Sequence, residues 1–163
     1  MKTIIFTIVG VLFSVYSYAQ NDSIAVSQMK ELGVYYFDGN NLKQILPIMP
    51  EKIRAFANPL FLGEDSENII ENTPVFYVFI PSEYKNRLSA KQFRIVTLAS
   101  NNGKRKVKSK TDGNYMIMKA EKLNEECYKL LLNEPLKEGH YGIFYNYGNR
   151  VPLKLYDFDI VNK

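Results

Sequence analysis

The sequence has no tryptophan, one cysteine and one histidine. A single cysteine cannot form an internal disulfide, so the fold depends on its apolar core, and we expect Cys127 to be a small buried group rather than a reactive thiol. A single histidine, His140, excludes a histidine pair or a histidine-rich zinc site. Because His140 lies between Gly139 and Tyr141 at the start of an expected strand, we predict a turn or surface position rather than a general base.

Catalytic motifs with a recognisable spacing are also missing. The chain has no Gly-x-Ser-x-Gly nucleophile elbow and no glycine-rich loop that could hold a phosphate group. We therefore predict no catalytic residue, no metal ligand and no cofactor, and we expect binding rather than catalysis.

One apolar run near the start of the chain is typical of a signal peptide. Lys2 precedes the apolar stretch Ile4 to Tyr16, and Ser17-Tyr18-Ala19 places small residues where a signal peptidase cleaves. The run is too short for a membrane span of about 20 residues, and no later run is longer. We predict a signal peptide over residues 1–19 and one exported domain over 20–163, in the periplasm or outside the cell. No cysteine follows the cleavage site, so a bacterial lipoprotein is not expected.

Positive charge is concentrated in one segment. The formal net charge is +4, and residues 104–110 contain five of the lysines and arginines. The rest of the exported chain has a small excess of acids, which argues against a protein that covers nucleic acid over a whole face. An anionic envelope component or another exported protein is the expected partner, and the oligomeric state is left open.

The periodicity predicts an all-β domain with one or two short helical turns. Val75 to Ile80 is uninterrupted apolar between two prolines, which favours a strand in the middle of the core. Turn residues at 38–41, 101–103 and 148–150 separate β-rich runs and predict hairpins. Without a sustained helical period, the pattern indicates a single-domain antiparallel β-sandwich or a small barrel.

Four other segments carry weaker expectations. Gln20 to Lys30 is predicted to be a weakly ordered lead-in or a short strand, and Ala120 to Glu126 a brief helical turn. Glu51 to Ala57 fits either a short helix or an irregular edge. Gly63 to Glu71 is polar and acidic, as expected of a surface loop.

Six strand sequences follow one another in a recognisable order: Gly33-Val34-Tyr35-Tyr36, Thr73 to Phe79, Phe93 to Leu98, Tyr128-Lys129-Leu130, Leu136 to Phe144 and Tyr156 to Ile160. This order, which spans nearly the whole exported chain, resembles a functionally uncharacterised domain of exported bacterial proteins. The chain departs from the pattern at Lys137-Glu138-Gly139-His140, where Pro-Gly-Glu is usual. The resemblance implies an envelope location and one β domain, and it brings no activity and no catalytic residues.

A row of lysines is the first candidate binding feature. On a strand, Lys104, Lys106, Lys108 and Lys110 share one face, and Arg105, Val107 and Ser109 face the other way. With Arg105 beside them, these lysines form a basic ribbon that fits an anionic partner. Lysines that protect an edge strand from aggregation are the alternative.

A row of tyrosines is the second candidate binding feature. Tyr141, Ile143, Tyr145 and Tyr147 share a face, opposite Gly142 and Phe144. Exposed tyrosines suit sugar rings or protein partners, although the missing tryptophan disfavours carbohydrate. Packing into the core is the alternative.

Acidic residues support two other function classes. Asp157 and Asp159 share a strand face about 7 Å apart, within the range of carboxylate pairs in glycoside hydrolases, so a small hydrolase is one alternative; two solvent-facing acids are the simpler expectation. Glu64, Asp65 and Glu67 could hold calcium but lack a regular loop spacing. A protruding loop over Gly63 to Asn72 would suit an inhibitor of a secreted enzyme.

Overall fold

The fold is an all-β sandwich with one helix, seen in a computed structural model that describes residues 20–38, 41–50, 60–71, 73–107, 115–146 and 154–161. The first sheet contains β1 (Gly33–Asp38), β2 (Asn41–Ile45), β5 (Phe76–Phe79), β9 (Lys119–Lys122) and β10 (Cys127–Leu131). The second contains β3 (Leu60–Leu62), β4 (Ile69–Glu71), β6 (Phe93–Asn101), β7 (Lys104–Val107), β8 (Tyr115–Ile117), β11 (Gly139–Tyr145) and β12 (Tyr156–Val161). The signal-peptide prediction and the segment Glu51 to Ala57 lie outside the described residues.

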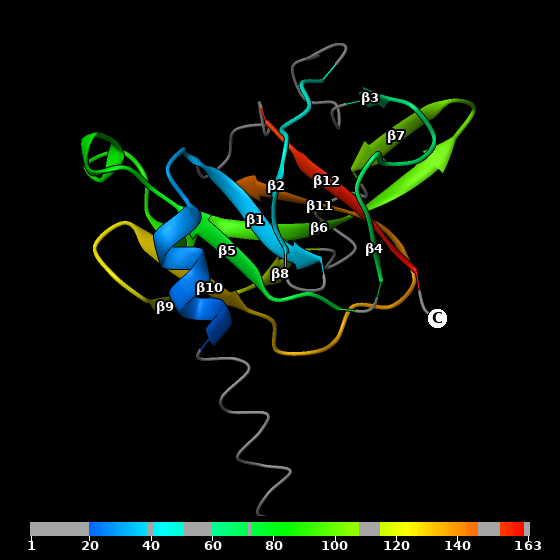
Figure 1. Cartoon of the computed structure of the whole chain (residues 1–163). Helices are drawn as coiled ribbons and strands as arrows, with labels where there is room; N and C mark the ends of the chain where they lie inside the picture. Colours follow the sequence, from blue (N-terminus) through cyan, green and yellow to red (C-terminus); the bar gives the residue numbers. More distant parts are fainter. Residues whose placement is uncertain are drawn as a thin grey trace, which may run out of the picture.

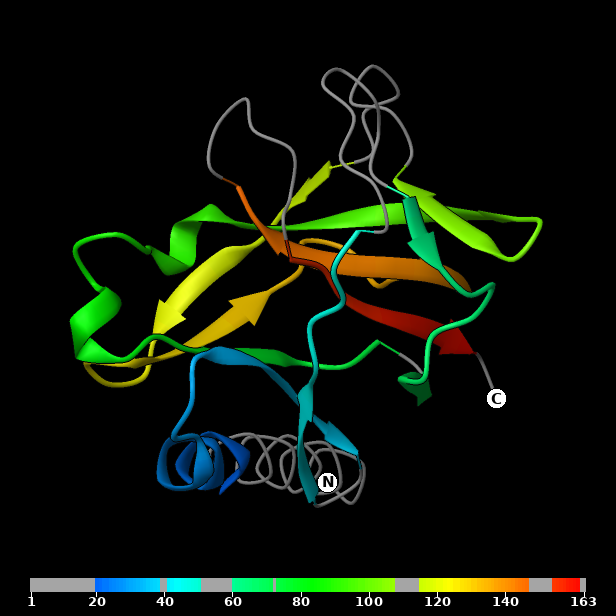
Figure 2. The ribbon, with the colours of Figure 1, turned by 90° about the horizontal axis from the view of Figure 1, so that it is seen from above.

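Strand order confirms the predicted sandwich. The first sheet runs β2-β1-β5-β10-β9, and the second runs β3-β7-β6-β11-β12-β4 with β8 paired to β6. All pairs are antiparallel except β12 with β4. In Figure 1 the strands of the two sheets overlap, and Figure 2 separates the layers, with β11 (orange) and β12 (red) on the side of the first sheet away from the helix.

The predicted hairpins are confirmed by the register. β1 pairs with β2 through Asp38 and Asn41, and β6 pairs with β7 through Asn101 and Lys104. In the second turn Asn102 has φ 52° and Gly103 has φ 73°, and positive φ at both central residues is what a two-residue type I′ turn requires. β11 and β12 pair antiparallel as the third hairpin requires, and its predicted turn at 148–150 lies outside the described residues.

The helix over 20–28 corrects the expectation of a loose lead-in. It covers the outer face of the first sheet, where Ala25 and Met29 pack against Tyr35, Tyr77 and Cys127. The Asp22 carboxylate binds the Lys129 ammonium at 2.9 and 3.0 Å and accepts a hydrogen bond from the Tyr77 hydroxyl at 2.8 Å. None of the helices in the described ranges has the length and hydrophobicity of a membrane-spanning helix.

Burial on both faces explains why β5 is apolar throughout. Phe76 and Val78 point into the core between the sheets, whereas Tyr77 and Phe79 point toward the helix. From the opposite sheet, Phe158 meets Phe76 with ring centroids 4.9 Å apart. The predicted central strand is therefore confirmed, since β5 lies between β1 and β10 and all four of its residues are buried.

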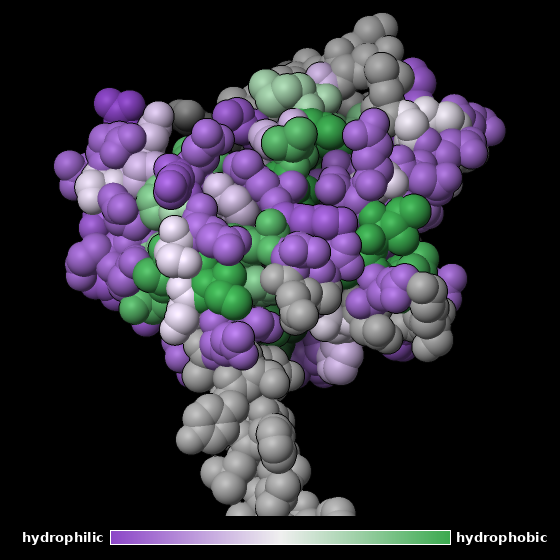
Figure 3. Space-filling view, viewed as in Figure 1, coloured by the Kyte–Doolittle hydropathy of each residue, from purple (hydrophilic) through white to green (hydrophobic). Residues whose placement is uncertain are grey.

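One loop expectation is wrong and another holds in part. The segment expected to wind at Ala120 to Glu126 begins as strand β9, which pairs with β10. The acidic segment after Gly63 is a surface loop over residues 63–68, although Ser66 is buried, and its end, Ile69–Glu71, forms β4 beside β12. Figure 3 shows apolar patches separated by hydrophilic residues on the face seen there.

Candidate functional site

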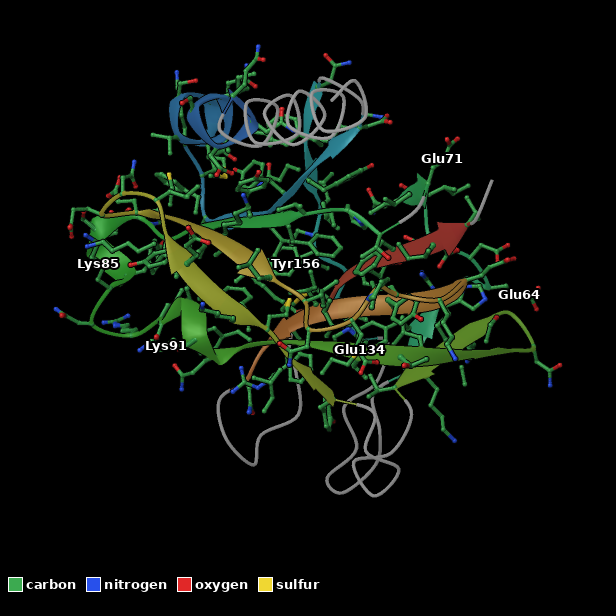
Figure 4. All side chains as sticks on the ribbon, turned by 90° about the horizontal axis from the view of Figure 1, so that it is seen from below. Glu64, Glu71, Lys85, Lys91, Glu134 and Tyr156 are labelled. Carbon is green, nitrogen blue, oxygen red and sulfur yellow. The ribbon has the colours of Figure 1, made fainter. Side chains whose placement is uncertain are left out.

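A cavity of about 390 Å³ opens at one end of the sandwich. It lies where β6 and β12 begin and β11 ends, between these strands, the segment before β1 and the loop that contains η1 (Ser82–Tyr84) and η2 (Ala90–Gln92). Its lining is Leu32, Tyr84, Arg87, Leu88, Phe93, Tyr145, Lys154 and Tyr156. Several of these side chains also pack against the core, so the cavity continues the space between the two sheets. Figure 4 labels Tyr156 together with Lys85 and Lys91, which belong to the loop beside the cavity.

Hydrogen bonds hold the wall of the cavity in place. The Tyr145 hydroxyl accepts from the Ser89 backbone N–H at 3.0 Å and bonds to the Gln92 side chain, with the Arg87 carbonyl 3.2 Å away. At the start of the same loop, the Glu126 carboxylate accepts from Ser82 N–H at 2.7 Å and from the Ser82 hydroxyl at 2.6 Å. These bonds lower the pKa of Glu126 from its ordinary value. The loop is thus fixed to the first sheet and the second, which pre-forms the cavity.

Two cations at the cavity have no counter-ion in the part of the chain that the structure describes. The Arg87 guanidinium and the Lys154 ammonium are both exposed, and neither forms an ion pair or a side-chain hydrogen bond with a described residue. A second hollow on the same loop has Tyr128 and three lysines in its lining, and two of these lysines, Lys85 and Lys122, pair with Glu125. The end cavity differs in having four aromatic side chains, Tyr84, Phe93, Tyr145 and Tyr156, beside its two cations.

The tyrosine row shares one face as predicted, but this face points into the molecule. Tyr141 is buried and its ring stacks on Phe158 at 5.8 Å, so it is a core residue and the prediction of a binding role for it is wrong. Burial raises the pKa of Tyr141, and its hydroxyl donates to the Lys137 carbonyl. Tyr145 lines the cavity, and Tyr147 lies outside the described residues.

The lysine row is described at two of its four positions. Lys104 and Lys106 alternate with the buried residues Arg105 and Val107, which confirms the predicted strand period. Lys108 and Lys110 lie outside the described ranges. β7 pairs with β3 on one side and β6 on the other, so Lys104 and Lys106 do not sit on an edge strand and the anti-aggregation role does not apply to them.

The burial of Arg105 and Asp157 corrects two predictions, the surface binding role of Arg105 and the solvent-facing position of Asp157. Arg105 is 4% exposed and Asp157 is 2% exposed, and the two side chains form an ion pair beneath the surface. Arg105 also donates from Nε to the Gly63 carbonyl at 3.2 Å. Arg105 therefore cannot belong to a surface contact for an anionic partner, and Asp157 is not a solvent-facing acid.

Asp159 is buried as well, because the segment after Gly63 covers it. Its Oδ2 accepts from the Ser66 N–H at 2.9 Å, and its Oδ1 lies 2.8 Å from His140 Nδ1. The Ser66 hydroxyl donates to the Asp157 carbonyl at 3.1 Å. The loop proposed for an inhibitor is thus bound to β12 over much of its length. Figure 4 places Glu64, at the start of this loop, at the end of the sandwich opposite Lys85 and Lys91.

Cys127 lies under the helix, fully buried. Burial raises the pKa of its thiol, an effect that a hydrogen bond with Asn124 partly opposes. The predicted burial of Cys127 is therefore confirmed.

Arg87, Lys154 and Tyr84 were missed in the sequence. They come from separate segments with no shared periodicity, and the pairing of strands brings them together.

Comparison with models of protein families, with curated proteins and with solved structures found no match. The resemblance to an exported bacterial domain therefore stays a prediction.

Proposed function

We propose that this protein is an exported, non-enzymatic binding domain of the bacterial envelope, and that it holds a small anion with an apolar or aromatic body in the end cavity. The observation that carries the proposal is the cavity itself: about 390 Å³, with Tyr84, Tyr145 and Tyr156 in its lining beside Arg87 and Lys154, two cations that no described acid neutralises. Ligand sites commonly have such a volume and combine apolar walls with a few charged groups.

The chemistry of the lining selects the ligand class. Tyrosine, phenylalanine and leucine side chains offer apolar and aromatic contact area. An arginine guanidinium binds carboxylate or phosphate groups with two parallel hydrogen bonds, and a lysine adds a point charge. A carboxylate, sulfonate or phosphate on an apolar body satisfies both parts of the lining.

The hydrolase alternative has less support. Asp157 is committed to Arg105, and both oxygens of Asp159 contact Ser66 or His140. Neither carboxylate lines the end cavity. These contacts support a structural role for the pair more than a role in hydrolysis.

Titration with anilinonaphthalene sulfonate tests the proposal, because this dye is an anion on an aromatic body and its fluorescence rises in apolar sites. The double substitution Arg87→Gln and Lys154→Gln should weaken binding at least about tenfold, since hydrogen bonds to charged groups contribute about 1.5–3 kcal/mol each. Lys119→Gln with Lys137→Gln removes the same charge from exposed positions outside the cavity and should leave binding unchanged. Equal affinity in the first variant, or an equal loss in the control, would contradict the proposal.

A further inference from the structure

Three side chains from distant parts of the chain meet at the other end of β11. Asp65 comes from the loop between β3 and β4, His140 from β11 and Asp159 from β12. One ligand atom of each lies within 4.8 Å of the other two. His140 and Asp159 are paired across the two strands, which places both side chains on the same outer face of the sheet.

Backbone contacts, rather than the acid itself, bring Asp65 to this place. The next residue, Ser66, donates its N–H to Asp159 at 2.9 Å, and the Asn68 carbonyl accepts from the Asp159 N–H at the same distance. The Asn68 side chain adds a bond to the Asp157 carbonyl at 3.1 Å. The position of Asp65 is therefore set by the fold before any ligand binds.

The cluster brings two carboxylates and one imidazole together at a partly buried place. Asp159 is 7% exposed, and a buried carboxylate is costly unless a positive charge or hydrogen bonds face it. Among the described residues, its ionisable partner is His140, whose Nδ1 lies 2.8 Å from its Oδ1. Asp65 adds a second carboxylate to the same space, so a cation bound among the three groups would face both acids. Arg105, on the same face of the sheet, is already paired with Asp157.

We propose that Asp65, His140 and Asp159 bind one divalent transition-metal ion, for which Zn²⁺ is the best fit. An imidazole nitrogen with two carboxylates is a ligand set that Zn²⁺ accepts, whereas Ca²⁺ and Mg²⁺ prefer oxygen ligands alone. Zn–N and Zn–O bonds of about 2.0–2.2 Å place the ligand atoms of a tetrahedron about 3.3–3.6 Å apart. His140 Nδ1 and Asp159 Oδ1, which are 2.8 Å apart, would therefore separate slightly. Asp65 would approach them by up to about 1.5 Å, which rotation of its exposed side chain can supply. Because Asp65 and the partly exposed His140 border the solvent, a water molecule would complete the tetrahedron.

The site is independent of the end cavity and does not rest on the proposed function. A bound metal would join the segment over residues 63–68 to β11 as well as to β12. Hydrogen bonds already connect this segment to β12. Bound metal would therefore raise the thermal stability of the domain, since a ligand that binds only the folded state stabilises it.

Metal titration of untagged protein, stripped with a chelator, tests this site. Equilibrium dialysis should find one Zn²⁺ per chain, and Co²⁺ should give visible absorption of a site with nitrogen and oxygen ligands. Asp65→Asn and His140→Gln should each weaken Zn²⁺ binding at least about tenfold and remove the thermal shift. Glu67→Gln removes an exposed acid of the same loop and should leave both unchanged.

Three results would overturn the inference. These are sub-stoichiometric binding, binding that persists in Asp65→Asn and His140→Gln, and a Co²⁺–thiolate band, which would assign the metal to Cys127. Ca²⁺ binding as tight as Zn²⁺ binding would contradict the role of the imidazole. Circular dichroism of each metal-free variant checks its fold, and if His140→Gln unfolds the protein, the exposed Asp65→Asn variant decides.

Discussion

Arg105 on β7 and Asp157 on β12 form an ion pair whose two side chains are 5% and 3% exposed, although β6 and β11 lie between their strands. The pair crosses the outer face of the second sheet. It joins the lysine-bearing hairpin to the last strand of the described fold.

Breaking this pair should strongly destabilise the protein. Arg105→Met or Asp157→Leu alone leaves one buried charged group without its partner, a loss of about 3–5 kcal/mol in the free energy of unfolding. Arg105→Met combined with Asp157→Leu removes both charges and should recover much of that loss. Urea unfolding of the three variants measures the coupling, and losses that simply add would show that the two side chains act independently.

Gly142 is expected to tolerate no side chain. A Cβ at this position would lie 2.4 Å from Cδ1 and 2.7 Å from Cγ of the fully buried Leu155. Gly142→Ala should therefore cost about 1–3 kcal/mol of stability through overpacking. Gly33→Ala is the matched control, because the added Cβ meets the end of the flexible Gln44 side chain and the cost should be smaller. Combining Gly142→Ala with Leu155→Ala should cost less than the sum of the single losses, as thermal unfolding would reveal.

The thiol of Cys127 should react slowly while the helix over 20–28 is in place. Since burial raises its pKa, the reactive thiolate forms only at a higher pH than in an unfolded chain, and the rate should rise as pH increases through that raised value. Ala25→Glu places a charge in the apolar contact of the helix and should accelerate modification by a thiol reagent. Gln28→Glu adds the same charge at an exposed position of the helix and should not. Equal rates in the two variants would show that the helix does not protect Cys127.

The lysine row is expected to strengthen attraction to anionic surfaces. Replacing Lys104, Lys106, Lys108 and Lys110 with Gln should abolish retention on anionic liposomes or acidic glycans at low salt, because exposed charges act over about 10 Å at 0.1 M ionic strength and weaken as salt rises. Dye binding in the end cavity should be unaffected, which separates the two proposed contacts. Retention equal to that of the unmodified protein would refute a role for the row.

Local patterns were sufficient for most strands. Val75 to Ile80 is apolar at every position, and Asn102-Gly103 is a strong turn signal, so β5 and the hairpin of β6 and β7 could be predicted from neighbouring residues alone. The helix over 20–28 could not, because its apolar contact consists of few residues and its polar anchor, Asp22, binds Lys129. That partner is 107 residues away in the sequence.

The candidate site was largely beyond prediction for the same reason. Asp157 and Asp159 alternate with core residues, and a local pattern places such acids in solvent. Their burial depends on Arg105 and Ser66, which are distant in sequence. Tyr145 was identified from its strand, whereas its neighbours Arg87 and Lys154 in the cavity carry no local signal.

The position of β12 has a consequence for the order of events in the cell. This strand supplies Phe158 and Ile160 to the centre of the molecule and lies between β11 and β4. A growing polypeptide that has not yet reached residue 161 lacks these contacts, so it cannot complete its native packing while that part is still being made. The native packing of the core therefore follows the synthesis of the segment that ends at Val161.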